Sequence, residues 1–118
     1  MKLRIQGNSL RLRLTHKDVA HLSGHGRVES LIEFSPGQAL VYRLEGSFCA
    51  KSVDAAFDGQ AIRVTIPAHV MTQWAESDQV SIEAQSSAGL QLLIEKDFQC
   101  LHGRGEQDRD AYSRPLIS

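Results

Sequence analysis

Residues 1–15, MKLRIQGNSLRLRLT, decide the predicted fold. Apolar residues alternate with polar ones on both sides of a central Gly-Asn pair, which predicts two strands joined by a two-residue type II′ hairpin turn with glycine first. In this register Arg4 faces Arg11 across the hairpin. Lys2 likewise faces Arg13, so the leucines share one face and the cations share the other. Because like charges opposite each other are unfavourable, the pattern calls for acidic neighbours or a bound anion.

The same pattern returns 52 residues later, in residues 53–67, VDAAFDGQAIRVTIP. Residues 1–46 align without a gap on residues 53–98, and this predicts two ββαββ repeats. Arg11 is matched by Arg63 in this alignment. The other cations are not kept, since the positions matching Lys2, Arg4 and Arg13 hold Asp54, Ala56 and Thr65. The hairpin pattern therefore does not depend on the cluster of positive charge.

The remaining elements follow from periodicity and turn residues. A short helix follows the first hairpin of each half: Thr15 caps the first helix and Gly24 and Gly26 end it, while Pro67 starts the second. The predicted strands cover residues 2–6, 9–14, 28–34, 39–45, 53–57, 61–66, 79–84 and 90–96. The predicted class is α+β, with a largely antiparallel eight-stranded sheet that either curls into a barrel or is covered by the helices.

Length and composition predict one ordinary domain. The 118 residues, 42% of them apolar, suit a single domain over residues 1–102, followed by a flexible, charged tail over residues 103–118. The net charge of -1 gives no overall attraction to nucleic acid or acidic membranes. Without a long apolar run or a signal-like start, the sequence predicts a cytoplasmic protein with no membrane association.

The cations have two competing explanations. In the first, acidic side chains of neighbouring strands form solvated ion pairs with them, and the sequence favours this structural explanation. The candidate acidic partners are Glu33, Glu83, Glu95 and Asp97. In the second, the guanidinium groups converge on a phosphate-containing small molecule. The candidate anion-binding residues are Lys2, Arg4, Arg11, Arg13, Arg63 and Lys96.

Other chemistries have less support in the sequence. A nucleic-acid interface is disfavoured because the aromatic residues fall mostly in the apolar phase of the strands. His16, His21 and His25 lack the i, i+4 spacing of a helical metal site, and Cys100 with His102 would supply only two ligands. The sequence contains no glycine-rich phosphate loop, nucleophile elbow or metalloprotease motif, so we predict no cofactor and no metal.

Two segments resemble signatures of a family of small, uncharacterised bacterial proteins. They are the opening MKLRIQGNSLRLRLT and the segment EKDFQCL at residues 95–101. The resemblance covers nearly the whole chain and implies a bacterial cytoplasmic protein, with no activity to transfer. The residues that match these signatures are Arg4, Gly7, Asn8, Ser9, Arg11, Arg13, Glu95, Lys96, Asp97, Phe98 and Cys100.

A more distant likeness concerns architecture. Duplicated strand and helix units around an eight-stranded barrel are similar to the triphosphate-tunnel (CYTH) phosphohydrolases. Those enzymes carry an E-x-E-x-K strand, where this chain has Lys-Leu-Arg-Ile-Gln. The prediction is therefore a non-enzymatic binding or accessory module with an anion site. The alternatives are a tunnel-type phosphohydrolase and an interaction module that uses a sheet edge, for example in a homodimer.

Overall fold

The computed structural model describes residues 1–97, and its elements follow the order β-β-α-β-β twice. The helices are α1 (His16–His25) and α2 (Ala68–Ala75). The strands are β1 (Lys2–Gln6), β2 (Ser9–Leu14), β3 (Arg27–Ser35), β4 (Gln38–Ser47), β5 (Asp54–Phe57), β6 (Ala61–Pro67), β7 (Ser81–Gln85) and β8 (Gln91–Lys96). An α+β fold with two helices is confirmed. The predicted tail, residues 103–118, lies outside the described residues.

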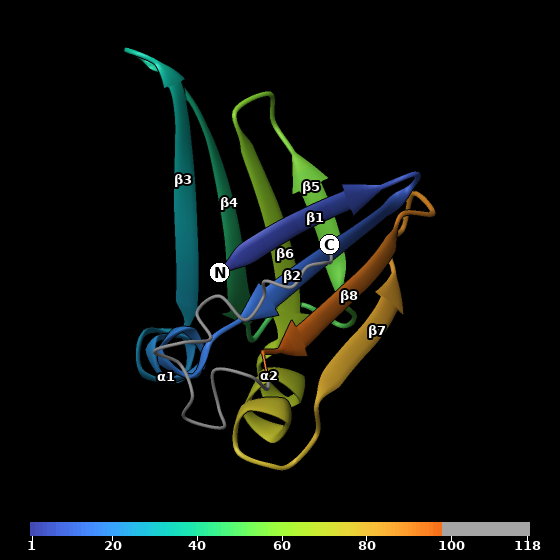
Figure 1. Cartoon of the computed structure of the whole chain (residues 1–118). Coiled ribbons are helices and arrows are strands. Elements are labelled where there is room, and N and C mark those ends of the chain that lie inside the picture. The colour runs from blue at the N-terminus through green and yellow to red at the C-terminus, as the bar shows by residue number, and fades with distance from the viewer. Residues whose placement is uncertain (98–118) are drawn as a thin grey trace.

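The strands form two separate sheets of four strands each (Figure 1). Sheet A has the order β1-β2-β8-β7, and sheet B has the order β3-β4-β6-β5. In each sheet two antiparallel hairpins meet along a central parallel pair, β2 with β8 and β4 with β6. The prediction of one largely antiparallel eight-stranded sheet is therefore wrong. Both sheets are mixed, and residues 1–97 form no closed barrel.

The physical reason is that each helix carries the chain from one sheet to the other. The hairpin β1–β2 lies in sheet A, and after α1 the hairpin β3–β4 lies in sheet B; α2 makes the reverse crossing. Alternation along a strand shows which face is buried but not which hairpin lies beside it. Since a triphosphate tunnel needs a closed barrel, the likeness to tunnel enzymes loses its architectural basis.

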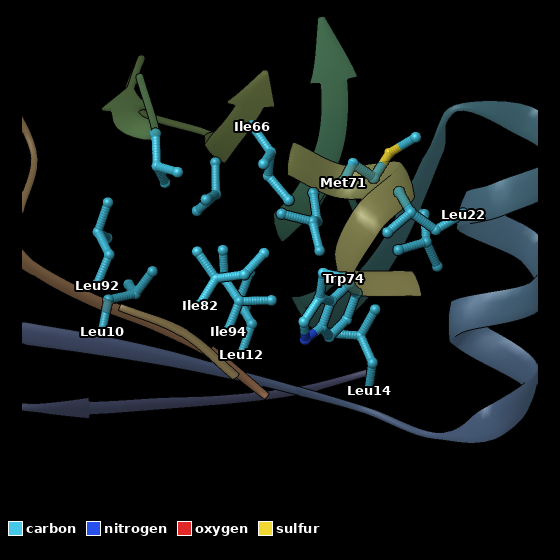
Figure 2. Packing of buried hydrophobic residues seen from close by; sticks show 14 residues of the cluster. Leu10, Leu12, Leu14, Leu22, Ile66, Met71, Trp74, Ile82, Leu92 and Ile94 are labelled. Atoms are coloured by element: carbon cyan, nitrogen blue, oxygen red, sulfur yellow. The ribbon is translucent and has the colours of Figure 1, made fainter. Parts of the chain in front are cut away.

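The core lies between the inner faces of the two sheets, and both helices close it at one end (Figures 1 and 2). Trp74 of α2 is fully buried there and lies beside Leu14 of β2 in Figure 2. The buried apolar residues are Leu10, Leu12, Leu14, Leu22, Val28, Leu44, Val53, Val64, Ile66, Met71, Trp74, Ile82, Leu92 and Ile94. Both halves of the chain therefore contribute to one core.

Helix α1 begins with the predicted cap and ends later than predicted. Thr15 Oγ1 accepts from the Asp18 N–H at 3.1 Å, and Asp18 Oδ2 accepts from the Thr15 N–H at 2.9 Å. Burial opposes ionisation of Asp18, but the N-terminal ammonium group and the Thr15 N–H outweigh it and hold the pKa of this carboxyl below its usual value. Gly24 lies inside the helix, and Gly26 ends it with φ of 81°. Glycine adopts that φ without steric cost.

The gapless alignment of the two halves fails after the helices. The first hairpins keep the separation of 52 residues, since Lys2 pairs with Arg13 and Asp54 with Thr65. The alignment then matches buried Val28 to Val80, but Val80 is exposed and Ile82 is buried instead. The connection from α2 to β7 is longer than the single residue between α1 and β3. The first buried residue of the following strand therefore comes two positions later than the alignment predicts.

Candidate functional site

Four cations lie together on the outer face of sheet A, on the side away from the core. Lys2 pairs with Arg13 across the β1–β2 hairpin. Arg4 pairs with Arg11 in the same register, as predicted. Gly7 adopts φ of 56°, as the first residue of a type II′ turn requires, and this turn fixes the register. These four residues form the cationic face.

Glu95 of β8 is the main carboxylate beside the cationic face. Because β8 runs parallel to β2, Glu95 is in register with Arg13. Arg13 donates to Glu95 Oε2 from Nε at 2.9 Å and from Nη2 at 2.8 Å. Arg11 Nε lies 3.9 Å from the same oxygen. Charge-assisted pairs with two donors are among the stronger polar contacts in proteins, so one carboxylate offsets much of the repulsion between two arginines.

Asp97 supplies a second negative charge, just beyond the end of β8. Its side chain is buried, and its Oδ2 lies 3.9 Å from Lys2 Nζ. Its backbone N–H donates to the Leu14 carbonyl at 2.8 Å, which holds this end of the chain against β2. Three of the four cations therefore have a carboxylate within 4.0 Å. The sheet itself provides the acidic neighbours that the hairpin pattern calls for.

Arg4 differs from the other three cations. Its Nη2 donates to Gln6 Oε1 at 3.4 Å, a neutral partner on its own strand. Within residues 1–97 no carboxylate forms an ion pair with Arg4. Arg4 thus remains the cation with the least compensation, and it lies directly opposite Arg11.

An open hollow of about 380 Å³ lies beside the cationic face, over β8. Arg11 borders it from β2, Glu83 borders it from β7, and Leu93 lies between them. Ser9 and Gln91 add neutral polar groups to the lining. The hollow therefore has a cation on one side and a carboxylate on the other, which makes it less basic than the cationic face alone.

Three predicted site residues lie elsewhere. Arg63 is on β6 in sheet B, where its Nη2 lies 3.0 Å from Asp58 Oδ2. Glu33 is on β3, also in sheet B. Lys96 follows Glu95 on β8, so its side chain leaves the opposite face of the strand; its Nζ donates to the Ser77 carbonyl at 2.8 Å. The structure brings together Lys2, Arg4, Arg11, Arg13, Glu95 and Asp97, with Glu83 across the hollow.

Asp58 shows why Arg63 is held where it is. The carboxylate accepts from the N–H groups of Gln60 and Ala61 at 2.9 and 2.8 Å, within the β5–β6 turn. These two bonds, with a smaller contribution from Arg63, hold the pKa of Asp58 below its usual value. The aspartate therefore stays charged near neutral pH and holds the Arg63 guanidinium group beside the β5–β6 turn.

A different exposed surface lies on the hairpin β3–β4. β3 is an edge strand of sheet B, and its end projects past the helix-covered core in Figure 1. Leu31, Ile32 and Phe34 are 61%, 48% and 72% exposed. These three residues, with the free edge of β3, form the β3 surface. Exposed apolar residues in a cluster point to an interaction site more strongly than scattered ones do.

The metal and cysteine predictions can be compared with residues 1–97 only. In that part of the chain no three histidine, cysteine, aspartate or glutamate side chains are grouped so that they could hold a metal ion. The His21 and His25 rings stack with their centres 4.1 Å apart, and Cys49 is exposed with a free thiol. Cys100 and His102 lie outside the described residues. Neither described helix has the length and apolar character needed to cross a membrane.

Comparison with known proteins places the chain in a family. Residues 1–116 match the model of DUF7009, a family of unknown function. The protein belongs to this family. The family match confirms the resemblance to an uncharacterised family over nearly the whole DUF7009 chain. No curated protein and no solved structure matches the chain.

The β3 surface of this DUF7009 protein was missed because its sequence fits an ordinary strand. Val28 is buried as the alternation predicts, but both faces of the strand carry apolar residues further along. Leu31 and Ile32 stand next to each other, so one of them must face away from the core. Adjacent apolar residues of this kind in a strand expected to be half-buried were the available signal.

Proposed function

We propose that this protein is a binding module that adds an extended segment of a partner polypeptide to the free edge of β3. The observation that carries the proposal is an edge strand of nine residues whose outer half exposes three large apolar side chains. Natural proteins usually shorten, charge or cover such edges, because an open edge pairs with any compatible strand. An uncovered one suits recognition by strand addition, in which backbone hydrogen bonds and alternate side chains both contribute.

The backbone pattern defines which groups of β3 are available. The Gly46 N–H donates to the Gly26 carbonyl at 2.9 Å, so the even-numbered residues of β3 direct their backbone groups toward β4. The odd-numbered residues direct theirs away from sheet B. Residues 27, 29, 31 and 33 therefore present a row of N–H and C=O groups at the edge.

The side chains beside this row define the partner. Leu31 lies on the outer face of the sheet together with Glu29 and Glu33, while Ile32 follows the face of Val28. Phe34 lies at the register shift between Glu33 and Ser35, where the alternation of the strand is interrupted. A fitting partner is an extended segment of β-branched residues that places methyl groups, from valine on one face and threonine on the other, beside both faces of β3. Such a segment would cover the exposed side chains while its backbone pairs with the edge.

A short acetylated peptide of alternating valine and threonine tests the proposal. We expect it to bind at low protein concentration and Leu31→Pro to lose this binding, because proline removes one outward N–H and no bond to β4. Glu83→Pro makes the matching change on the edge strand β7 of sheet A, and it should bind as the wild type does. Fluorescence anisotropy of the labelled peptide measures this. Equal binding by wild type and Leu31→Pro would contradict the proposal.

A second candidate function is the binding of a phosphate-containing small molecule at Arg4 and Arg11. The specific observation is that these two guanidinium groups are directly opposed, while Arg4 pairs with no carboxylate of residues 1–97. Two such groups on one sheet face can share the oxygens of a phosphate group. Glu95 competes with this anion, because it already contacts Arg11 and Arg13.

This competition gives the second candidate a distinctive test. Calorimetric titration with tripolyphosphate should show tighter binding by Glu95→Gln, on the order of tenfold, because the variant removes a charge that repels the ligand. Arg11→Gln should abolish binding. Arg63→Gln is the matched control, since it removes an arginine of the other sheet, and it should change nothing. Absence of binding by both wild type and Glu95→Gln would remove this candidate.

A further inference from the structure

We propose that the segment received by the β3 edge is β3 of a second copy of this chain. This inference rests on the proposed function and names its partner. The two strands pair antiparallel about a two-fold axis at Ser30, so that Arg27 of each copy faces Glu33 of the other. Closed two-fold pairing of this kind is the commonest symmetry among soluble oligomers.

The outward backbone groups restrict the register. Because only odd-numbered residues of β3 turn their N–H and C=O groups outward, each odd residue must face another odd residue across the new pair. Placing Leu31 opposite its own copy would bring Glu29 of each chain against Glu33 of the other. Placing Glu29 opposite its own copy would oppose two identical carboxylates. Both registers put like charges together, which costs stability.

The register centred on Ser30 pairs opposite charges at both of its ends and covers residues 27–33 of each copy. It places Arg27 opposite Glu33 of the second copy, and symmetry repeats this pair at the other end. Glu29 then faces Leu31, and it remains bound to its own Arg43, whose Nε lies 2.8 Å from Glu29 Oε1. Charge complementarity therefore favours this register over those centred on Glu29 and Leu31.

Arg27 and Glu33 are well suited to this use. Both side chains are exposed, and neither makes an ion pair with another residue in the described range 1–97. In sheet B the other arginines, Arg43 and Arg63, each have a carboxylate within 3.0 Å. The two charged groups of β3 that form no ion pair within residues 1–97 thus pair with each other between copies.

The apolar side chains agree with the same register. On the inner face, Val28 of one copy faces the exposed Ile32 of the other, and this contact also occurs twice. Each Leu31 lies beside the aliphatic part of Glu29 from the second copy. Pairing joins the two B sheets into one continuous sheet, so that β3 ceases to be an edge.

A charge exchange tests the paired side chains. We expect sedimentation equilibrium to show a dimer for the wild type. Arg27→Glu and Glu33→Arg should each raise its dissociation constant about tenfold or more, since two attractive pairs become repulsive. The double variant Arg27→Glu/Glu33→Arg should restore wild-type affinity. Restoration is decisive because a purely structural effect of either substitution would not be reversed by the other. Failure of the double variant to recover would overturn this register.

A disulfide tests the symmetry axis independently. In a Cys49→Ser/Cys100→Ser background, Ser30→Cys should form a covalent dimer under mild oxidation. Residues facing each other at a position without backbone hydrogen bonds have Cα atoms about 4.5 Å apart, within the range that a disulfide spans. Leu31→Cys is the matched control and should crosslink far less, because its copies are offset along the strands. Preferential crosslinking through Leu31→Cys would overturn the proposed axis.

The results separate this inference from the proposed function. A wild type that is monomeric at all concentrations, yet binds the valine-threonine peptide in a manner lost in Leu31→Pro, overturns the second copy and leaves strand addition intact. A monomer that binds no peptide overturns both. A dimer that persists unchanged in Leu31→Pro overturns the second copy as the partner of this edge, since its contact would lie elsewhere, and the peptide titration then decides on strand addition.

Discussion

Replacing Trp74 by alanine is expected to lower the free energy of unfolding by about 3–5 kcal/mol, the cost typical of deleting a large buried aromatic residue. The indole is fully buried in α2, at the end of the core that the helices close (Figure 2). Its Nε1 donates to the Val80 carbonyl at 3.0 Å, and Lys96 Nζ lies 5.4 Å from the centre of the ring. Alanine would remove all three contributions and leave the Val80 carbonyl with one donor, the Lys96 N–H at 3.0 Å.

Chemical denaturation followed by far-UV circular dichroism measures this loss. Trp74→Phe keeps most of the apolar contact but not the hydrogen bond, so we expect it to cost roughly 1–2 kcal/mol. Phe48→Ala is the control for an aromatic deletion, because Phe48 is 98% exposed, and it should change stability by less than about 0.5 kcal/mol. A loss below about 2 kcal/mol in Trp74→Ala would show that the indole contributes less to stability than its full burial indicates.

Replacing Gly46 by alanine should destabilise the protein by about 1 kcal/mol through overpacking, the low end of the usual range. A Cβ at this position of β4 would lie 2.6 Å from Met71 Sδ and 3.0 Å from Met71 Cε. Met71 is buried, but the two clashing atoms are the end of its flexible side chain and border an open hollow beside Gly46, so the thioether can move aside in part. The three heavy atoms nearest to such a Cβ all belong to Met71, so glycine at this position allows the close approach of β4 and α2.

The partner residue provides the test of this cause. In a Met71→Ala background, Gly46→Ala should cost little, because the clashing atoms are gone, and a double-mutant cycle from denaturation curves measures the coupling. Gly24→Ala is the control: nothing lies within 4 Å of a Cβ there, and alanine favours the interior of α1. It should leave stability unchanged or raise it by up to about 1 kcal/mol. An equal cost of Gly46→Ala in both backgrounds would contradict overpacking.

Local features of the fold could be predicted because local forces determine them. The alternation around Gly7 gives the β1–β2 hairpin and its register, and Thr15 with Asp18 gives the start of α1. These signals depend on residues that are near one another in sequence. The order of strands in a sheet depends on packing between distant segments instead. For that reason the prediction placed all eight strands in one sheet.

The candidate site shows the same division. The opposed cations follow from hairpin geometry alone, but their contact with Glu95 requires β8 to lie parallel beside β2. The alignment of Arg63 with Arg11 suggested one shared site, whereas the crossing helices put these arginines on different sheets. Lys96 was grouped with Glu95 by nearness in sequence, although neighbouring residues of a strand face opposite ways. Predictions on Phe98, Cys100 and His102 lie outside residues 1–97.

Sheet A combines the first and the last hairpin of the described chain, and this arrangement determines the order in which its contacts can form. In sheet A, Leu10 pairs with Leu92, 82 positions further along. The parallel contact at the centre of that sheet cannot form until β8 (Gln91–Lys96) has been synthesised. Such distant contacts slow folding, because the entropy of closing a long loop must be overcome first. During synthesis, the leucines of the β1–β2 hairpin would therefore stay exposed to solvent until β8 has left the ribosome.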